Sequence, residues 1–191
     1  MKGRFDSGAG FFFWGFSVAT ALLVIGCGGS DTDATQAGGS SGTPAGGSTC
    51  TIAIDPERAL ALINAARSTG RHCGDAFYPA TTPLTWDRQL QQAAQRHADD
   101  MSSHGYLAHI GTDGSAPADR VTDAGYRWMT VAENVAAGYD SLEDAMNGWI
   151  ESPGHCANLM NPNLKHYGVA CSSNPDSPLG VYWTQVFAGP R

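Results

Sequence analysis

The order of helix-forming and strand-forming segments after Cys50 constrains the fold of this chain most. Apolar residues recur at helical spacing in four segments, each with a start or stop signal such as Asp, Ser, Pro or Gly. They run from Asp55-Pro56 to Gly70, from Asp87 to Gly105, from Ala118 to Asp123 and from Ser141 to Pro153-Gly154. Strand signals lie at residues 130–136, around Tyr167, Val169 and Cys171, and at residues 181–187. Early helices followed by paired strands indicate an α+β fold and not a βαβ fold.

Residues 1–26 have the pattern of an export signal. Lys2 and Arg4 precede an apolar run, FFFWGFSVATALLVIG, which ends directly at Cys27. The last four residues of this pattern, Val-Ile-Gly-Cys, resemble a bacterial lipobox, in which Cys27 becomes the lipidated first residue after cleavage. A plain secretory signal or a membrane-spanning anchor is the alternative, although the run is near the lower length limit for a spanning helix. We therefore expect a lipid-anchored protein of the bacterial cell envelope.

Residues 27–49 connect the lipidated cysteine to the rest of the chain. They are rich in Gly, Ser and Thr and contain almost no large apolar side chains. Such a segment cannot bury enough surface to offset its ordering entropy, so it is predicted to be a flexible tether. Gly28 after the cysteine, in place of Asp, indicates sorting to the outer membrane or the cell surface.

Residues 50–191 have the length of one domain and contain four cysteines. An even number of cysteines in an exported chain predicts two disulfides, and four cysteines allow three pairings. We expect Cys50–Cys73 and Cys156–Cys171, because each would close a modest local loop. No pair has CxxC spacing, which argues against a zinc ribbon or a thioredoxin-like site.

The charge of the chain argues against nucleic acid as a partner. The formal net charge is −7, and Lys165 is the one lysine after the predicted signal. Binding to phosphate groups requires clustered Lys and Arg, so we expect no nucleic acid.

Three blocks of sequence resemble the CAP superfamily, the cysteine-rich secretory, antigen 5 and pathogenesis-related-1 proteins, in its bacterial SCP-like form. They are HADDMSSHGYLAHI with His109, AEN with Glu133, and SPGH with His155. The resemblance implies a three-layer α-β-α sandwich with a central antiparallel sheet. It also implies that His109, Glu133 and His155 share one cleft, where they bind a ligand, a divalent metal, or both.

The resemblance is incomplete at a fourth position. Many members of the family have a second glutamate three residues after the helix tryptophan, which is Trp149 here. That position is Ser152, and Glu151 is one residue early, so it would point about 100° away on a helix. Two histidines and one glutamate can still hold zinc with a water in the fourth place, and zinc is the ion we expect. Without a metal, the same three groups can only exchange protons.

Other polar residues of these segments have simpler interpretations. His97 shares a face with Leu90, Ala94 and Met101, so we interpret it as a core histidine that makes a structural hydrogen bond. Asn64 and Arg67 resemble a structural pair of the family. Asp119 and Arg120 are expected to form a local salt-bridged corner. Ser152 lies near His155, but no GxSxG turn surrounds it, which argues against a serine nucleophile.

Two functions from different classes follow. The first is an envelope lipoprotein whose cleft binds a lipid, a glycan or a peptide, with or without a divalent metal. The second is a metal-dependent extracellular hydrolase, peptidase-like, that uses the same cleft. A single carboxylate cannot both bind the metal and act as a free base, and HExxH is absent, so we favour the binding module.

Overall fold

The computed structural model describes residue 50 and residues 54–191. The predicted signal, Cys27 and the tether at residues 27–49 lie outside these described residues. The elements are α1 (Pro56–Arg67), β1 (Arg71–Cys73), β2 (Ala76–Tyr78), β3 (Thr85–Trp86), α2 (Arg88–His104), α3 (Pro117–Asp123), β4 (Trp128–Ala137), α4 (Leu142–Glu151), α5 (Pro153–Met160), β5 (His166–Ser173) and β6 (Val181–Pro190). None of the described helices is both long enough and apolar enough to cross a membrane.

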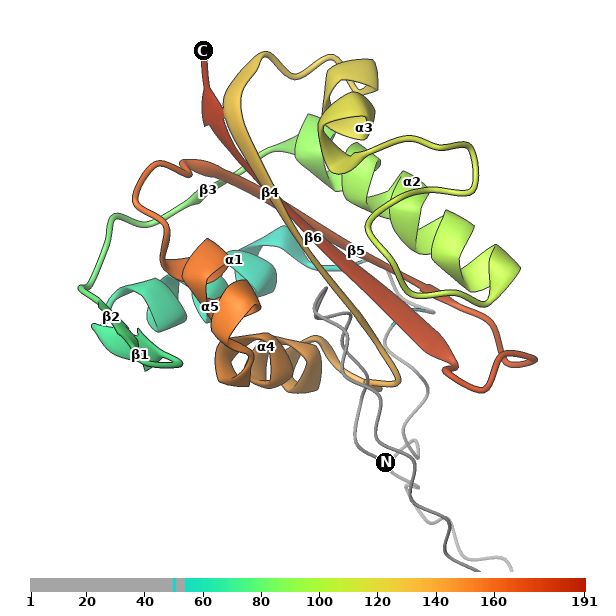
Figure 1. Cartoon of the computed structure of the whole chain (residues 1–191), viewed down its shortest axis with the longest axis horizontal. Coiled ribbons are helices and arrows are strands. Elements are labelled where there is room, and N and C mark those ends of the chain that lie inside the picture. The colour runs from blue at the N-terminus through green and yellow to red at the C-terminus, as the bar shows by residue number, and fades with distance from the viewer. Residues whose placement is uncertain (1–49, 51–53) are drawn as a thin grey trace, which may run out of the picture. The chain divides into compact units, whose positions relative to one another are not determined.

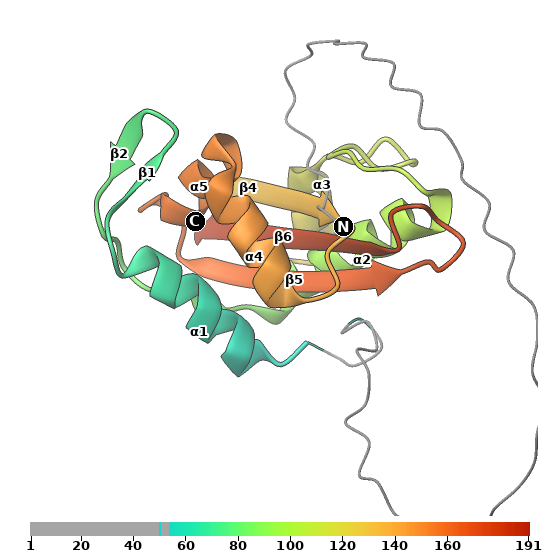
Figure 2. The ribbon, with the colours of Figure 1, turned by 90° about the horizontal axis from the view of Figure 1, so that it is seen from below.

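The central sheet has four strands in the order β3-β5-β6-β4. β6 pairs antiparallel with β5 and with β4, while the short β3 runs parallel to β5. Helices α1, α4 and α5 cover one face of this sheet and α2 and α3 cover the other (Figures 1 and 2). The predicted α+β sandwich is therefore confirmed, with one parallel pair added to the antiparallel sheet.

Alternation along β5 and β6 divides the core into two main clusters. Val169 and Phe187 face the side of α1, α4 and α5, where Trp149 and Trp183 are fully buried. Ala170 and Val186 face α2 and α3. Successive side chains of a strand point to opposite faces, so both faces of β5 and β6 are apolar and both are covered by helices.

Local capping explains where most helices begin. The Asp55 side chain accepts from the N–H of Glu57, Asp87 accepts from the second residue of α2, and Ser141 accepts from the N–H of Asp144. Gly105 ends α2 in the left-handed conformation with φ of 67°. These are the signals from which the helices were predicted.

Two local features differ from the prediction. Pro153 and Gly154 do not simply end α4: Ser152 is extended, and Pro153 begins α5. Proline suits the first position of a helix, which explains why a new helix starts there. The sequence patterns also did not predict the β1–β2 hairpin, which pairs Arg71 with Tyr78, or the two-residue strand β3.

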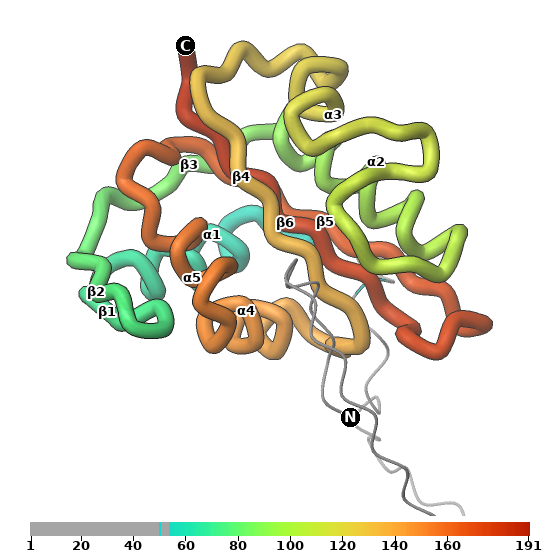
Figure 3. Tube along the Cα trace, viewed as in Figure 1, coloured from blue at the N-terminus to red at the C-terminus, as the bar shows by residue number. Residues whose placement is uncertain are grey.

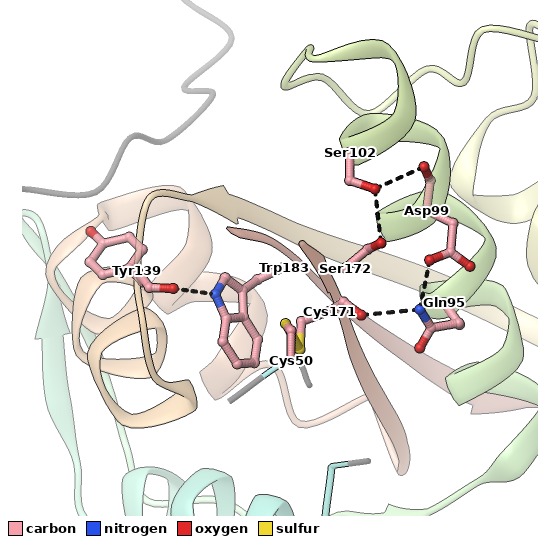
Figure 4. The surroundings of a disulfide bond; sticks show 8 residues. All are labelled: Cys50, Gln95, Asp99, Ser102, Tyr139, Cys171, Ser172 and Trp183. Carbon is pink, nitrogen blue, oxygen red and sulfur yellow. Dashed lines mark hydrogen bonds between the residues drawn. A yellow bond between two sulfur atoms is a disulfide. The ribbon is translucent and has the colours of Figure 1, made fainter. Parts of the chain in front are cut away.

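The predicted disulfide pairing was wrong. The bonds are Cys50–Cys171, with a sequence separation of 121, and Cys73–Cys156, with a separation of 83. Figure 4 shows Cys50 beside Cys171 on β5, whose carbonyl oxygen accepts from Gln95 of α2 at 3.1 Å. Packing of the layers, and not distance along the chain, brings these cysteines together, so pairing by local loops failed.

Candidate functional site

Glu133 is the centre of a buried polar cluster on the face of β4 that α2 and α3 cover. Its side chain is 1% exposed. One carboxylate oxygen accepts from Nδ1 of His109 at 3.0 Å, and the other accepts from the guanidinium of Arg120 at 2.8 Å. Both oxygens of the buried carboxylate thus have a partner, as a charge in a dry environment requires.

Arg120 comes from α3 and holds two parts of the cluster together. Besides Glu133, it donates to the carbonyl of His109 at 2.9 Å and to the carbonyl of Ser115 at 2.7 Å. The predicted Asp119–Arg120 corner was wrong: the Arg120 ion pair is with Glu133, and Asp119 accepts from the N–H of Ala116 at the start of α3. The role of Arg120 as the partner of Glu133 was not predicted, because Glu133 lies on another element. The signal was Glu133 itself, since a buried carboxylate needs a cation.

His109 lies in the segment between α2 and α3, which doubles back beside α2 (Figure 3). Asp100 of α2 holds this segment, accepting from the backbone N–H of Thr112 at 2.8 Å and from the hydroxyl of Tyr106. Arg120 adds its contact to the His109 carbonyl. The His109 side chain is 38% exposed, so it is the member of the cluster that reaches solvent.

His97 of α2 is a fully buried member of the same cluster, as predicted from its position among apolar residues. Its Nε2 donates to the carbonyl of Ala108 at 2.7 Å and lies 3.8 Å from Glu133. Burial lowers the pKa of His97, and this outweighs the opposing effect of Glu133. His97 is therefore a neutral structural side chain that fixes the residue before His109.

His155 lies on the opposite side of β4. It is the third residue of α5 and is 5% exposed. The amide of Asn134 donates to the His155 carbonyl at 3.2 Å, and Asn158 of the same helix donates to Asn134 at 2.9 Å. Glu133 and Asn134 are neighbours on a strand, so they face opposite layers. The structure thus brings Glu133 and His109 into direct contact and places His155 against β4 from the other layer.

The chemistry of the cluster limits how a metal could bind. No group of three His, Cys, Asp or Glu side chains within the described residues is arranged to hold a metal ion. Both oxygens of Glu133 are engaged, and a guanidinium 2.8 Å away opposes a second cation at this carboxylate. Glu133 therefore fits poorly as a zinc ligand in this arrangement, and the metal site expected at His109, Glu133 and His155 stays a prediction.

No neighbouring residue supplies the glutamate that the family pattern has at position 152. Ser152 joins α4 to α5 and its carbonyl accepts from the N–H of Cys156. Glu151 is exposed at the end of α4. The site therefore contains one buried carboxylate, Glu133, with Arg120 as its cation.

The structural pair predicted on the first helix is confirmed. Asn64 accepts from the N–H of Leu84 at 2.8 Å and donates to the carbonyl of the same residue at 3.0 Å. Arg67 is fully buried and donates to the carbonyls of Leu159, at the end of α5, and Thr82. Both residues tie α1 to segments that are distant in the sequence, and they lie in the layer opposite Glu133.

Comparisons with known proteins agree with this fold. A model of the cysteine-rich secretory protein family, CAP, matches residues 60–187. The uncharacterized protein YkwD of Bacillus subtilis is 33% identical over 107 residues, which are 56% of this chain and 40% of that protein. The uncharacterized membrane protein YlbC of the same organism is 29% identical over 104 residues, 54% of this chain and 28% of that protein. The chain thus spans well under half the length of these two relatives.

Solved structures show the same architecture. An extracellular protein of Bacillus anthracis with an SCP domain is 28% identical with a TM-score of 0.56, covering 69% of this chain and 39% of that one. An outer surface protein of Borrelia burgdorferi is 18% identical with a TM-score of 0.54, covering 72% and 97%. Because the family model matches most of the chain, this protein belongs to the cysteine-rich secretory protein (CAP) family.

Proposed function

We propose that this protein is an exported ligand-binding module whose cleft presents His109 to a lipid, a glycan or a peptide at the cell envelope. His155 and α5 form the opposite wall of that cleft, across β4. The lipid on Cys27 would hold the domain at the membrane, in the outer membrane or at the cell surface.

The observation that carries the proposal is the support behind His109. Burying the Glu133–Arg120 pair costs desolvation energy, and apolar residues of similar volume would often stabilise a fold as well or better. Here the pair orients a half-exposed imidazole, because the Glu133 carboxylate, itself held by Arg120, lies 3.0 Å from Nδ1 of His109 and fixes the direction of the ring. An oriented imidazole at the edge of a cleft suits recognition of polar groups such as a hydroxyl or an amide.

A binding screen tests this proposal. The probes are dihexanoylphosphatidylcholine, N,N′-diacetylchitobiose and a synthetic octapeptide, each followed by ligand-observed NMR with the purified protein. We expect one class to bind and His109→Ala to weaken that binding about tenfold, the effect of about 1.4 kcal/mol. His72→Ala is the matched control, since His72 is exposed on β1. Equal affinity of both variants would show that His109 is not part of the binding site.

The metal-dependent hydrolase remains the alternative, and it has its own test. Elemental analysis and zinc calorimetry of the wild type, His109→Ala and His155→Ala would show whether the two imidazoles bind an ion. Stoichiometric zinc that both substitutions abolish would favour the hydrolase and justify assays with peptide substrates. Zinc that neither substitution affects would rule out the proposed ligands.

The descriptions of two similar structures support an extracellular or cell-surface location for this protein. One solved neighbour is described as extracellular and another as an outer surface protein. Expressing the full chain and the Cys27→Ser variant in a Gram-negative host tests the anchor. We expect the wild type in the membrane fraction and the variant in the soluble fraction. A variant that stays in the membrane fraction would contradict lipidation at Cys27.

A further inference from the structure

β4 is the last strand of its sheet, so half of its backbone groups point away from β6. The carbonyl of Ala188 on β6 accepts from Lys165 on the β5 side, at 2.9 Å. Backbone N–H and carbonyl groups of successive strand residues point to opposite sides, so those of Phe187 point toward β4. There Phe187 is paired in register with Ala132. Odd-numbered residues of β4 from Val131 to Val135 therefore direct their N–H and carbonyl groups outward.

Part of this outer edge is already occupied by side chains. The amide of Asn158 on α5 donates to the Glu133 carbonyl at 3.3 Å, and the indole of Trp149 on α4 donates to the Val135 carbonyl at 3.2 Å. These two bonds confirm the outward direction of the odd residues. They also close the C-terminal half of the edge to any further strand.

Within the part of the chain that the structure describes, the N-terminal half of the edge is open. No other described residue hydrogen-bonds to the N–H or the carbonyl of Val131, or to the N–H of Glu133. Residues 129–132 are Met-Thr-Val-Ala, so they contain none of the charges or prolines with which proteins usually protect an edge strand. Met129 lies at an irregularity in the β4–β6 register and is 72% exposed.

Positive charge lies at the start of this open edge. A cavity of about 530 Å³ adjoins Met129 and Trp128, and Arg127 and Arg191 line it. The N–H of Arg191 donates to the Arg127 carbonyl at 3.1 Å, which keeps the two residues side by side. Within the described residues, all seven ion pairs are formed by other side chains. In a chain with a net charge of −7, this pair of arginines favours an anionic group.

We propose that the open edge of β4, residues 129–133, binds an extended acidic peptide by strand addition. A peptide offers N–H and carbonyl groups at the spacing of the Val131 and Glu133 groups, which lipids and glycans do not. In the bound peptide, an acidic residue about four positions away from the peptide residue that lies opposite Val131 would reach Arg127. The open edge ends at Glu133, so the peptide would run into the cleft beside His109. The inference rests on the proposed function and names its ligand class.

The test uses a labelled octapeptide of alternating threonine and valine that ends in two glutamates, with fluorescence anisotropy as the readout. Val131→Pro removes the outward N–H, and an edge strand tolerates proline where its N–H faces outward. Val131→Ala is the matched control that keeps the N–H. We expect Val131→Pro to weaken binding about tenfold and Val131→Ala to leave it nearly unchanged.

Three further experiments keep the test decisive if Val131→Pro does not fold. A peptide N-methylated on alternate residues loses the backbone donors on one of its edges, and one of the two N-methylated registers should not bind. Arg127→Gln should weaken binding at least threefold, whereas Arg88→Gln, an exposed arginine at the start of α2, should not. A peptide ending in two lysines should bind more weakly than the acidic one.

Three outcomes would overturn strand addition: no binding of the acidic octapeptide, equal binding by Val131→Pro and Val131→Ala, or full binding of both N-methylated peptides. The His109→Ala variant separates this failure from failure of the proposed function. Peptide binding that depends on His109 and not on Val131 would retain the cleft and reject the edge. Peptide binding that Val131→Pro weakens and His109→Ala leaves unchanged would support strand addition and contradict the proposed cleft.

Discussion

At the scale of single residues, Arg120 is the side chain whose loss should cost the fold most. Arg120→Met leaves the Glu133 carboxylate buried without its cation, and we expect a loss of about 3–5 kcal/mol in the free energy of unfolding. The double variant Arg120→Met/Glu133→Gln should recover much of this, because the uncompensated charge is gone. Urea denaturation measures both.

Arg96→Gln is the control for this experiment. Arg96 pairs with Asp113 and Asp123, but its side chain is 46% exposed. Surface pairs contribute little, so its loss should cost less than about 1 kcal/mol. If the two single variants lost the same stability, burial would not govern the Glu133–Arg120 pair.

Asp100 should make the stability of the His109 segment depend on pH. Burial raises the pKa of Asp100, but hydrogen bonds from Thr112 and Tyr106 outweigh this and lower it to about 2. The folded pKa is below the unfolded value of about 3.9, so the stabilisation is full above that value and is lost as the pH falls through 2. Asp100→Asn should therefore melt at a lower temperature than the wild type at pH 6.

The melting temperatures of the two proteins should then converge as the pH is lowered from 4 toward 2. Differential scanning calorimetry across this range measures the gap. A gap that stays constant with pH would show that the carboxylate charge of Asp100 does not hold the segment.

At the scale of elements, the contact between α2 and β5 depends on a glycine. A Cβ at Gly168 would lie 2.2 Å from the backbone N of Gln91 and 2.6 Å from the carbonyl carbon of Leu90. Gly168→Ala would force α2 away from the sheet, and we expect a loss of at least about 1–3 kcal/mol. Chemical denaturation checks this.

Gly154→Ala provides the comparison, since a Cβ there meets nothing within 4 Å and the residue is helical. It should be neutral or stabilise the domain by up to about 1 kcal/mol, because alanine loses less backbone entropy than glycine. A similar loss at both positions would mean that the α2–β5 approach is not the cause.

At the scale of the whole domain, the disulfides connect layers that are distant in sequence. Cys73–Cys156 ties the β1–β2 hairpin to α5, and Cys50–Cys171 ties residue 50, upstream of α1, to β5. Replacing Cys73 and Cys156 with serine should cost about 2–5 kcal/mol, because the unfolded chain regains the entropy of a long loop. Urea denaturation of this double variant measures the loss.

Non-reducing peptide mapping tests the same bonds directly. Digestion should release one linked pair that contains Cys50 and Cys171 and another that contains Cys73 and Cys156. Linked peptides with Cys50–Cys73 or Cys156–Cys171 would contradict the layer packing described here.

Local signals in the sequence were enough for most elements and for part of the site. The caps at Asp55, Asp87 and Ser141 and the stop at Gly105 act within one helical turn, so they can be recognised without knowing the fold. The resemblance of three short blocks to a known family pointed to His109 and Glu133, which the structure brings to 3.0 Å. It also pointed to His155, which the structure places across β4.

Only the tertiary structure decided what surrounds these residues. Arg120 pairs with Glu133, Cys50 pairs with Cys171, and Val131 lies on an open edge, all because segments far apart in the chain meet in space. Periodicity and capping depend on neighbours three or four residues away, so they carry no information about such meetings. Sequence alone therefore determined four of the five helices, the three long strands and the family of this protein, while the partners of its buried charges and cysteines followed from the packing of its three layers.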